Sequence, residues 1–160
     1  MAERLYTLVK SQPFFKGMKA EHLRVLCDCA VEKEFGAGEW IFLEGSPANR
    51  FYILLNGKVS LDAETAGRGV VPVETLGPGD DLGWSWLLAP YYLHFSARAT
   101  EPTRVLFFFG TRLREHCDQD HDFGYEILRR VVKVVVQRLE ATRRQLAEPG
   151  SPAKAAAGKV

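Results

Sequence analysis

The stretch from Gly79 to Ala99 holds the residues of this chain that could best bind a small anion. It opens with Gly79-Asp80-Asp81-Leu82-Gly83-Trp84-Ser85-Trp86-Leu87-Leu88. This pattern predicts a glycine-rich turn, a short apolar helix and a direct return into a strand. Backbone N–H groups gather at the start of a helix, and glycine lets a ligand approach them closely. The sequence therefore predicts an anion-binding loop.

This stretch resembles the phosphate-binding cassette of the cyclic nucleotide-binding domain family, which includes the catabolite activator proteins and the protein kinase A regulatory subunits. Aligned without a gap, Gly83 falls on the cassette glycine, Leu87 and Leu88 on the small helix, and Ser96–Ala99 on the outgoing strand. The glutamate that holds the ribose in this family falls on Trp84. The arginine that neutralises the cyclic phosphate falls on Leu93. The resemblance thus implies a degenerate cassette without its two charged ligands.

Without the arginine, a cyclic phosphate loses a charge-assisted bidentate pair, which predicts binding weaker by about two to four powers of ten. An aromatic, apolar pocket that also includes Tyr91 and Tyr92 is expected instead. The candidate ligand-binding residues are Gly83, Trp84, Ser85, Trp86, Leu87, Leu93, His94 and Phe95.

Three interpretations of this pocket stay open. Its own side chains could fill it, which would leave a structural or partner-binding domain. It could accept an apolar or aromatic effector. It could also bind a cyclic nucleotide in an atypical way, through Ser85, His94 and backbone N–H groups.

The elements that must position this loop are mostly short β-rich runs with glycine corners, which predict a mainly β (α+β) antiparallel β-roll or jelly roll. We expect N-terminal helices over about residues 1–31, the roll over about 32–110, C-terminal helices over about 111–148 and a disordered tail over 149–160. Asn56-Gly57 predicts a hairpin between Phe51–Leu55 and Lys58–Leu61. The run Arg104–Phe109, which is continuously apolar after its arginine, predicts a strand buried on both faces.

The family resemblance extends well beyond the cassette. It continues in Phe35, Ala37-Gly38-Glu39, Ile41-Phe42 and Glu44-Gly45, then in Phe51–Leu54, Gly57 and Val59, and in Leu76 and Pro78-Gly79-Asp80. It runs from the first helix to near position 147, and it implies the β-roll fold of that family.

The last helix is predicted over His121–Glu148, and its pattern predicts a homodimer. A coiled-coil seam is expected at Leu128, Val132, Val135, Leu139, Thr142 and Leu146. A second apolar face, formed by Phe123, Ile127, Val131 and Val134, can pack on the roll. Arg138 and Arg143 flank the seam and could pair with Glu140 of the opposite chain. The alternative is a single broad stripe buried inside one domain.

Composition excludes several classes of protein. The 160 residues suit one domain, and a net charge of +1 gives no global field toward nucleic acid or membranes. No apolar run approaches the roughly 20 residues that cross a bilayer. Three cysteines, Cys27, Cys29 and Cys117, favour ordinary thiols in a reducing, cytoplasmic setting.

Motifs for catalysis and DNA reading are also missing. His22, His94, His116 and His121 are too scattered for a metal site, and no nucleophile elbow or Walker A loop occurs. In catabolite activator relatives a helix like the last one leads into a winged helix-turn-helix, for which too few residues follow here. We therefore expect a non-catalytic regulatory or scaffolding domain without metal, cofactor or DNA-binding module. The alternative is a small-molecule sensor that signals to a separate output protein.

Overall fold

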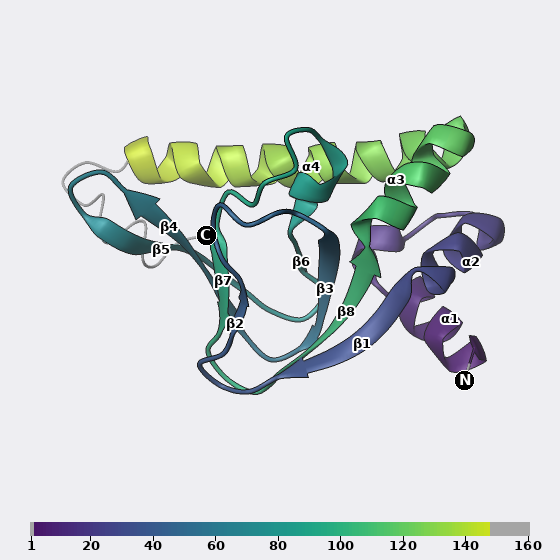
Figure 1. Cartoon of the computed structure of the whole chain (residues 1–160), viewed down its shortest axis with the longest axis horizontal. Helices are drawn as coiled ribbons and strands as arrows, with labels where there is room; N and C mark the ends of the chain where they lie inside the picture. Colours follow the sequence, from purple (N-terminus) through teal and green to yellow (C-terminus); the bar gives the residue numbers. More distant parts are fainter. Residues whose placement is uncertain (1, 148–160) are drawn as a thin grey trace.

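The computed structural model describes residues 2–147, apart from the side chains of residues 2, 141, 142 and 145–147. Two four-stranded antiparallel sheets form a β-roll with helices packed around it, and the long α4 runs along one side (Figure 1). This confirms the predicted β-roll with helical flanks. The predicted tail over 149–160 lies outside the described residues.

The elements follow one another along the chain in the order helices, roll, helices. They are α1 (Ala2–Lys10), η1 (Pro13–Phe15), α2 (Ala20–Asp28), β1 (Ala30–Phe35), β2 (Trp40–Phe42), β3 (Arg50–Asn56), β4 (Val59–Thr65), β5 (Gly69–Leu76), β6 (Asp81–Leu82), η2 (Trp84–Leu87), β7 (Ser96–Ala99), β8 (Thr103–Phe109), α3 (Gly110–Gln119) and α4 (His121–Ala147).

Strand β8 lies inside the first sheet, whose strand order is β1-β8-β3-β6. Because successive side chains of a strand point to opposite faces, β8 contributes to two separate cores. Leu106 and Phe108 face the helices, whereas Val105 and Phe107 face the second sheet. All four are buried, so the prediction of a strand buried on both faces is confirmed.

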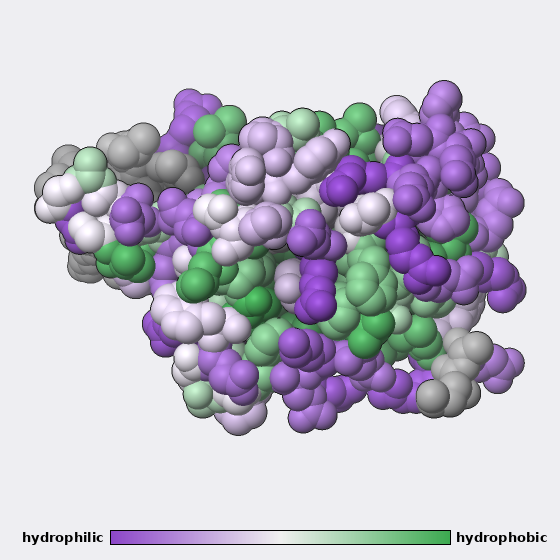
Figure 2. All heavy atoms as spheres, viewed as in Figure 1, coloured by the Kyte–Doolittle hydropathy of each residue, from purple (hydrophilic) through white to green (hydrophobic). Residues whose placement is uncertain are grey.

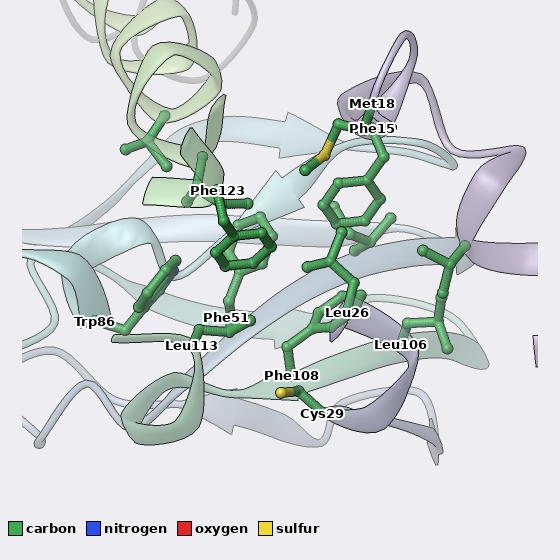
Figure 3. Close-up of a cluster of buried hydrophobic side chains, with 14 of the residues drawn as sticks. Phe15, Met18, Leu26, Cys29, Phe51, Trp86, Leu106, Phe108, Leu113 and Phe123 are labelled. Carbon is green, nitrogen blue, oxygen red and sulfur yellow. The ribbon is translucent and has the colours of Figure 1, made fainter. Parts of the chain in front are cut away.

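The core between the first sheet and the helices is the larger and more aromatic of the two. Figure 3 shows Phe15, Phe51, Phe108 and Phe123 gathered there with Trp86 at one edge. The ring centroids of Phe51 and Phe108 lie 5.8 Å apart, and those of Phe15 and Phe108 lie 5.5 Å apart. This core joins the N-terminal helices, the roll and α4 into one body.

Helix α2 ends at Asp28, three residues before the end expected for the N-terminal helices at about residue 31. Cys29 caps it, and β1 begins at Ala30, which pairs with Phe108 of β8. Pairing with β8 satisfies the backbone groups of Ala30 and Val31, so these residues extend the sheet and not the helix.

The predicted hairpin at Asn56-Gly57 is wrong. Strand β3 pairs with β8 and β6, whereas β4 pairs with β5 and β7 in the second sheet, whose order is β2-β7-β4-β5. The turn therefore carries the chain from one sheet to the other. Gly57 has φ +99°, and a Cβ there would lie 2.3 Å from Thr103 Oγ1 and 2.7 Å from the Pro102 carbonyl oxygen.

We predict that Gly57→Ala destabilises the protein more than Gly38→Ala. Both glycines have positive φ, which costs a residue with a side chain about 1–2 kcal/mol. Gly38 has open space around its missing Cβ, whereas at Gly57 the new methyl overlaps backbone atoms, which adds about 1–3 kcal/mol. Urea denaturation of the two variants measures the difference, and equal losses would contradict the close packing at this turn.

Candidate functional site

The predicted cassette glycine, Gly83, stands between β6 and η2 and cannot easily be another residue. Its φ is +82°, and a Cβ would lie 3.1 Å from the Arg50 carbonyl oxygen and 3.4 Å from the Tyr52 ring. The chain turns here into η2, a single 3-10 turn over Trp84–Leu87, and later enters β7 at Ser96. The turn, short helix and strand expected from the sequence are thus present.

The loop between η2 and β7 is tied down on two sides. The Leu93 N–H donates to the Ser46 carbonyl at 2.9 Å, and the Gly45 N–H donates to the Leu93 carbonyl at 2.9 Å. From α3, the guanidinium of Arg114 donates to the Trp86 carbonyl and lies 4.1 Å from the centre of the Tyr91 ring. These contacts fix the backbone direction at Leu93.

A small cavity lies between the cassette and the second sheet. Its volume is about 10 Å³, close to what one water molecule requires. The two positions that the resemblance assigns to charged ligands, Trp84 and Leu93, both contribute to its wall. The lining residues are Phe42, Leu61, Gly83, Trp84, Ser85, Leu93, Phe95 and Arg138.

The remaining predicted pocket residues lie elsewhere. Trp86 is fully buried in the core beside Phe51, at a ring distance of 5.9 Å (Figure 3), and Leu87 packs against the same core. His94 is exposed, and its ring stacks on Trp84 with centroids 5.5 Å apart. Tyr91 and Tyr92 are also exposed. The aromatic pocket is therefore narrower than predicted, because the side chains of η2 divide between core and cavity.

Arg138 of α4 lines the cavity, whereas its position in the sequence predicted a place beside the dimer seam. Its Nη2 donates to the Asp81 carbonyl at 2.7 Å, and its Nε donates to Glu74 Oε1 at 3.1 Å. Burial raises the pKa of Glu74, and the guanidinium limits that rise. A sequence signal was available: Arg138 follows the buried Val131 by seven residues, and so lies on the same helix face.

Helix α4 has a buried and an exposed apolar face. Phe123, Ile127 and Val131 are buried in the core. Of the predicted seam, Leu128, Val132 and Leu139 are 44%, 50% and 59% exposed, whereas Val135 is half-buried against the core. Tyr125 and Val136 complete the exposed row, and Figure 2 shows hydrophobic residues along the edge of the molecule where α4 lies. The side chains of Thr142 and Leu146 lie outside the described residues.

The three cysteines form no disulfide, and burial determines the direction in which their pKa values shift. It raises the pKa of Cys27 and Cys29, and that of Cys117 to about 11. Because the thiolate is the reactive form of cysteine, these thiols are poor nucleophiles at neutral pH. Within residues 2–147, no three His, Cys, Asp or Glu side chains gather so that they could hold a metal ion. None of the described helices combines the length and apolar character of a membrane span.

Comparisons with known proteins agree with this geometry. A family model described as "Cyclic nucleotide-binding domain" matches residues 32–120. The solved structure of a cyclic nucleotide-binding protein from Geobacter metallireducens is 34% identical and has a TM-score of 0.74, covering 86% of this chain and 97% of that one.

Two curated relatives extend the comparison. The "Cyclic nucleotide-gated ion channel 18" of Arabidopsis thaliana is 35% identical over 88 residues, which are 52% of this chain and 12% of the channel. The "CRP-like cAMP-activated global transcriptional regulator" of Mycobacterium tuberculosis is 25% identical over 146 residues, which are 88% of this chain and 63% of the regulator. The chain thus spans only part of each curated relative.

We predict that Asp81→Asn stabilises the protein at neutral pH but not in acid. Asp81 is 7% exposed, its Oδ2 has no hydrogen-bond partner among the described residues, and burial raises its pKa from 3.8 to about 6. The cost of burying the charged form is therefore fully present above the folded pKa and absent below the unfolded pKa. We expect a gain of roughly 1–3 kcal/mol at about pH 7.5 that disappears near about pH 4.

Denaturant titrations of the variant and of the unmodified protein across this pH range provide the measurement. Asp118→Asn, which changes an exposed carboxylate, is the control and should show little change at any pH. A gain from Asp81→Asn that is the same at both ends of the range would contradict the proposed cost of ionisation.

Proposed function

The chain belongs to the cyclic nucleotide-binding domain family, and on that premise we propose that it is a non-catalytic regulatory or scaffolding domain that does not bind cyclic AMP or cyclic GMP tightly. The observation that carries this proposal is the cavity beneath the cassette. The resemblance assigns Leu93 and Trp84 to the positions of the family's cation and carboxylate. Both line this cavity, whose volume is about 10 Å³. Pockets for small molecules measure about 300–1,000 Å³.

Charge supports the same proposal. A buried cyclic phosphate needs a cation, because an ionised group without a partner is costly to remove from water. Arg138 is the cation at the cavity wall, but it already contacts Glu74 and the Asp81 carbonyl. A nucleotide would have to displace these contacts and also open the cavity.

A second candidate function, a small-molecule sensor, is favoured by the position of Trp84. This indole is half-buried, and its described ring partner, His94, is itself exposed. Outward movement of Trp84 would enlarge a cavity whose other walls include Phe42, Leu61 and Phe95, which suits an apolar or aromatic effector. Because Arg138 lies at the same wall, such a movement would reach α4 and, through it, an output protein.

We also propose that the exposed row on α4 forms a homodimer. Leu128, Val132, Val136 and Leu139 recur at intervals of four, four and three residues, which places them along one side of the helix. Burying such side chains against a second copy is worth roughly 1.5–3 kcal/mol each before the entropic cost of association. A dimer would couple the two cassettes through their Arg138 contacts.

We predict that cyclic AMP binds the unmodified protein weakly or not at all, and that Leu93→Arg with Trp84→Glu restores binding. The arginine supplies the missing cation, and glutamate in place of the larger indole makes room for the sugar. We expect the affinity to rise by about two to four powers of ten over the unmodified protein, and less in each single variant. Isothermal calorimetry with cyclic AMP gives the affinities.

Leu88→Arg with Trp84→Glu is the matched control, because Leu88 is exposed and lies outside the cavity wall. It adds the same charges to the cassette without a cation in the cavity, so we expect no restored binding. Sub-micromolar binding by the unmodified protein would refute the proposal. A thermal-shift panel of small aromatic compounds tests the sensor, since a ligand of the native state raises the melting temperature.

Light scattering tests the dimer. We predict a dimeric mass for the unmodified protein at tens of micromolar and a monomeric mass for Val132→Glu with Leu139→Glu, because two charges would then be buried at the contact. Leu43→Glu with Val70→Glu changes two equally exposed apolar residues that do not belong to α4 and should leave the dimer intact. A monomeric mass in all three samples would contradict the proposal that α4 forms a dimer contact.

A further inference from the structure

A second pocket, larger than the cassette cavity, lies beside the start of β6. Its volume is about 460 Å³, within the range of small-molecule sites. Three segments that are far apart in sequence form its walls: the η1 turn, the loop into β6 and the middle of α4. The lining residues are Pro13, Phe14, Lys16, Gly79, Asp80, Asp81, Arg129, Arg130, Lys133, Val134 and Gln137.

Positive charge is concentrated in this pocket. Lys16, Arg129, Arg130 and Lys133 line it against the carboxylates of Asp80 and Asp81, although the chain as a whole has a net charge of only +1. Such a local excess of cations attracts anions even when the protein is nearly neutral.

The four cationic side chains differ in how many hydrogen bonds and ion pairs they already make within the protein. Arg130 donates to the Lys16 carbonyl at 2.7 Å and to Glu126 Oε1 at 2.5 Å, so it holds the pocket together. Arg129 shares Glu126 at 3.8 Å. Among the described residues, the ammonium groups of Lys16 and Lys133 have no ion-pair partner within 4 Å. These two lysines come from different elements, the turn that follows η1 and α4.

The two carboxylates in the pocket, Asp80 and Asp81, do not neutralise the positive charge of the two lysines. Asp80 Oδ2 accepts the Gly77 N–H at 2.9 Å, within its own turn. Asp81 is buried and pairs with neither lysine. Pro13, Phe14 and Val134 add an apolar wall, and Phe14 is held by ring contacts with Phe15 and Phe51. The pocket thus combines unengaged cations on two walls with a preformed apolar surface.

We propose that this pocket binds a small molecule that carries two adjacent phosphate groups on an apolar or aromatic body. One phosphate pairs with Lys16 and the other with Lys133 and Arg129, while the body packs on Pro13, Phe14 and Val134. The ligand bridges the η1 turn and α4, so its binding energy stabilises the docked position of α4. The site is separate from the cassette cavity, although Gly79, Asp80 and Asp81 of the cassette stretch line it. It does not depend on the function proposed above.

Calorimetric titration with ADP as the probe, in EDTA and at physiological ionic strength, tests this site. We expect ADP to bind more tightly than inorganic pyrophosphate, which lacks the body, and than adenosine, which lacks the phosphates. Lys16→Gln with Lys133→Gln should weaken ADP binding by about tenfold or more, because two charge-assisted contacts are lost. Lys19→Gln with Lys58→Gln removes the same charge from exposed positions outside the pocket and should change the affinity less than about twofold.

Each other outcome overturns the proposal. Equal weakening in both double variants would mean that ADP responds to overall charge. If pyrophosphate bound as tightly as ADP, the apolar wall would contribute nothing to the affinity. Binding of an acidic peptide but not of ADP would make this a protein-docking surface, and no binding of ADP at about 1 mM would leave no site of useful affinity. Melting temperatures of both double variants without ligand show whether each is folded.

Discussion

The Trp86 side chain lies fully buried where the cassette, the first sheet and α3 meet. Phe51 packs on one side of it, and the backbone of α3 starts so close that a Cβ on Gly110 would lie 2.9 Å from Trp86 Cβ. Its Nε1 has no hydrogen-bond partner among the described residues, so packing alone compensates for burying that donor. Because Trp86 fixes η2 to the core, Trp84 and Ser85 are turned toward the cavity. The shape of the cassette thus depends on one indole ring that makes no contact with the cavity.

Much of this fold could be predicted from the sequence because glycine corners, apolar alternation and family consensus residues indicated the same architecture. The position of Leu93 at the cavity followed from an alignment without gaps. The turn at Asn56-Gly57 was predicted wrongly, because the same local sequence occurs in hairpins and in turns that connect two sheets. What decided it was contact with Pro102 and Thr103, which are remote in sequence.

The candidate site was harder to predict, for two reasons. Trp84 and Trp86 are alike in type and two residues apart, and only the three-dimensional course of η2 shows that one reaches the cavity and the other the core. Arg138 belongs to a helix whose rotation against the roll determines its partners. If α4 were rotated by half a turn about its axis, the guanidinium of Arg138 would lie in solvent, away from Glu74 and the Asp81 carbonyl. Sequence periodicity gives the faces of a helix but not the groups that each face meets.

The strand order has a consequence for how the chain acquires its structure. Ala30 pairs with Phe108 and Phe35 with Thr103, so the first sheet closes only after almost the whole roll has been synthesised. The β4–β5 pair, in contrast, is joined by a local turn and can form early. Until β8 arrives, the apolar residues of β3 and the N-terminal helices lack the partner that buries them. A nascent chain of this protein therefore leaves these apolar surfaces exposed until late in translation, and an exposed apolar surface is prone to aggregate.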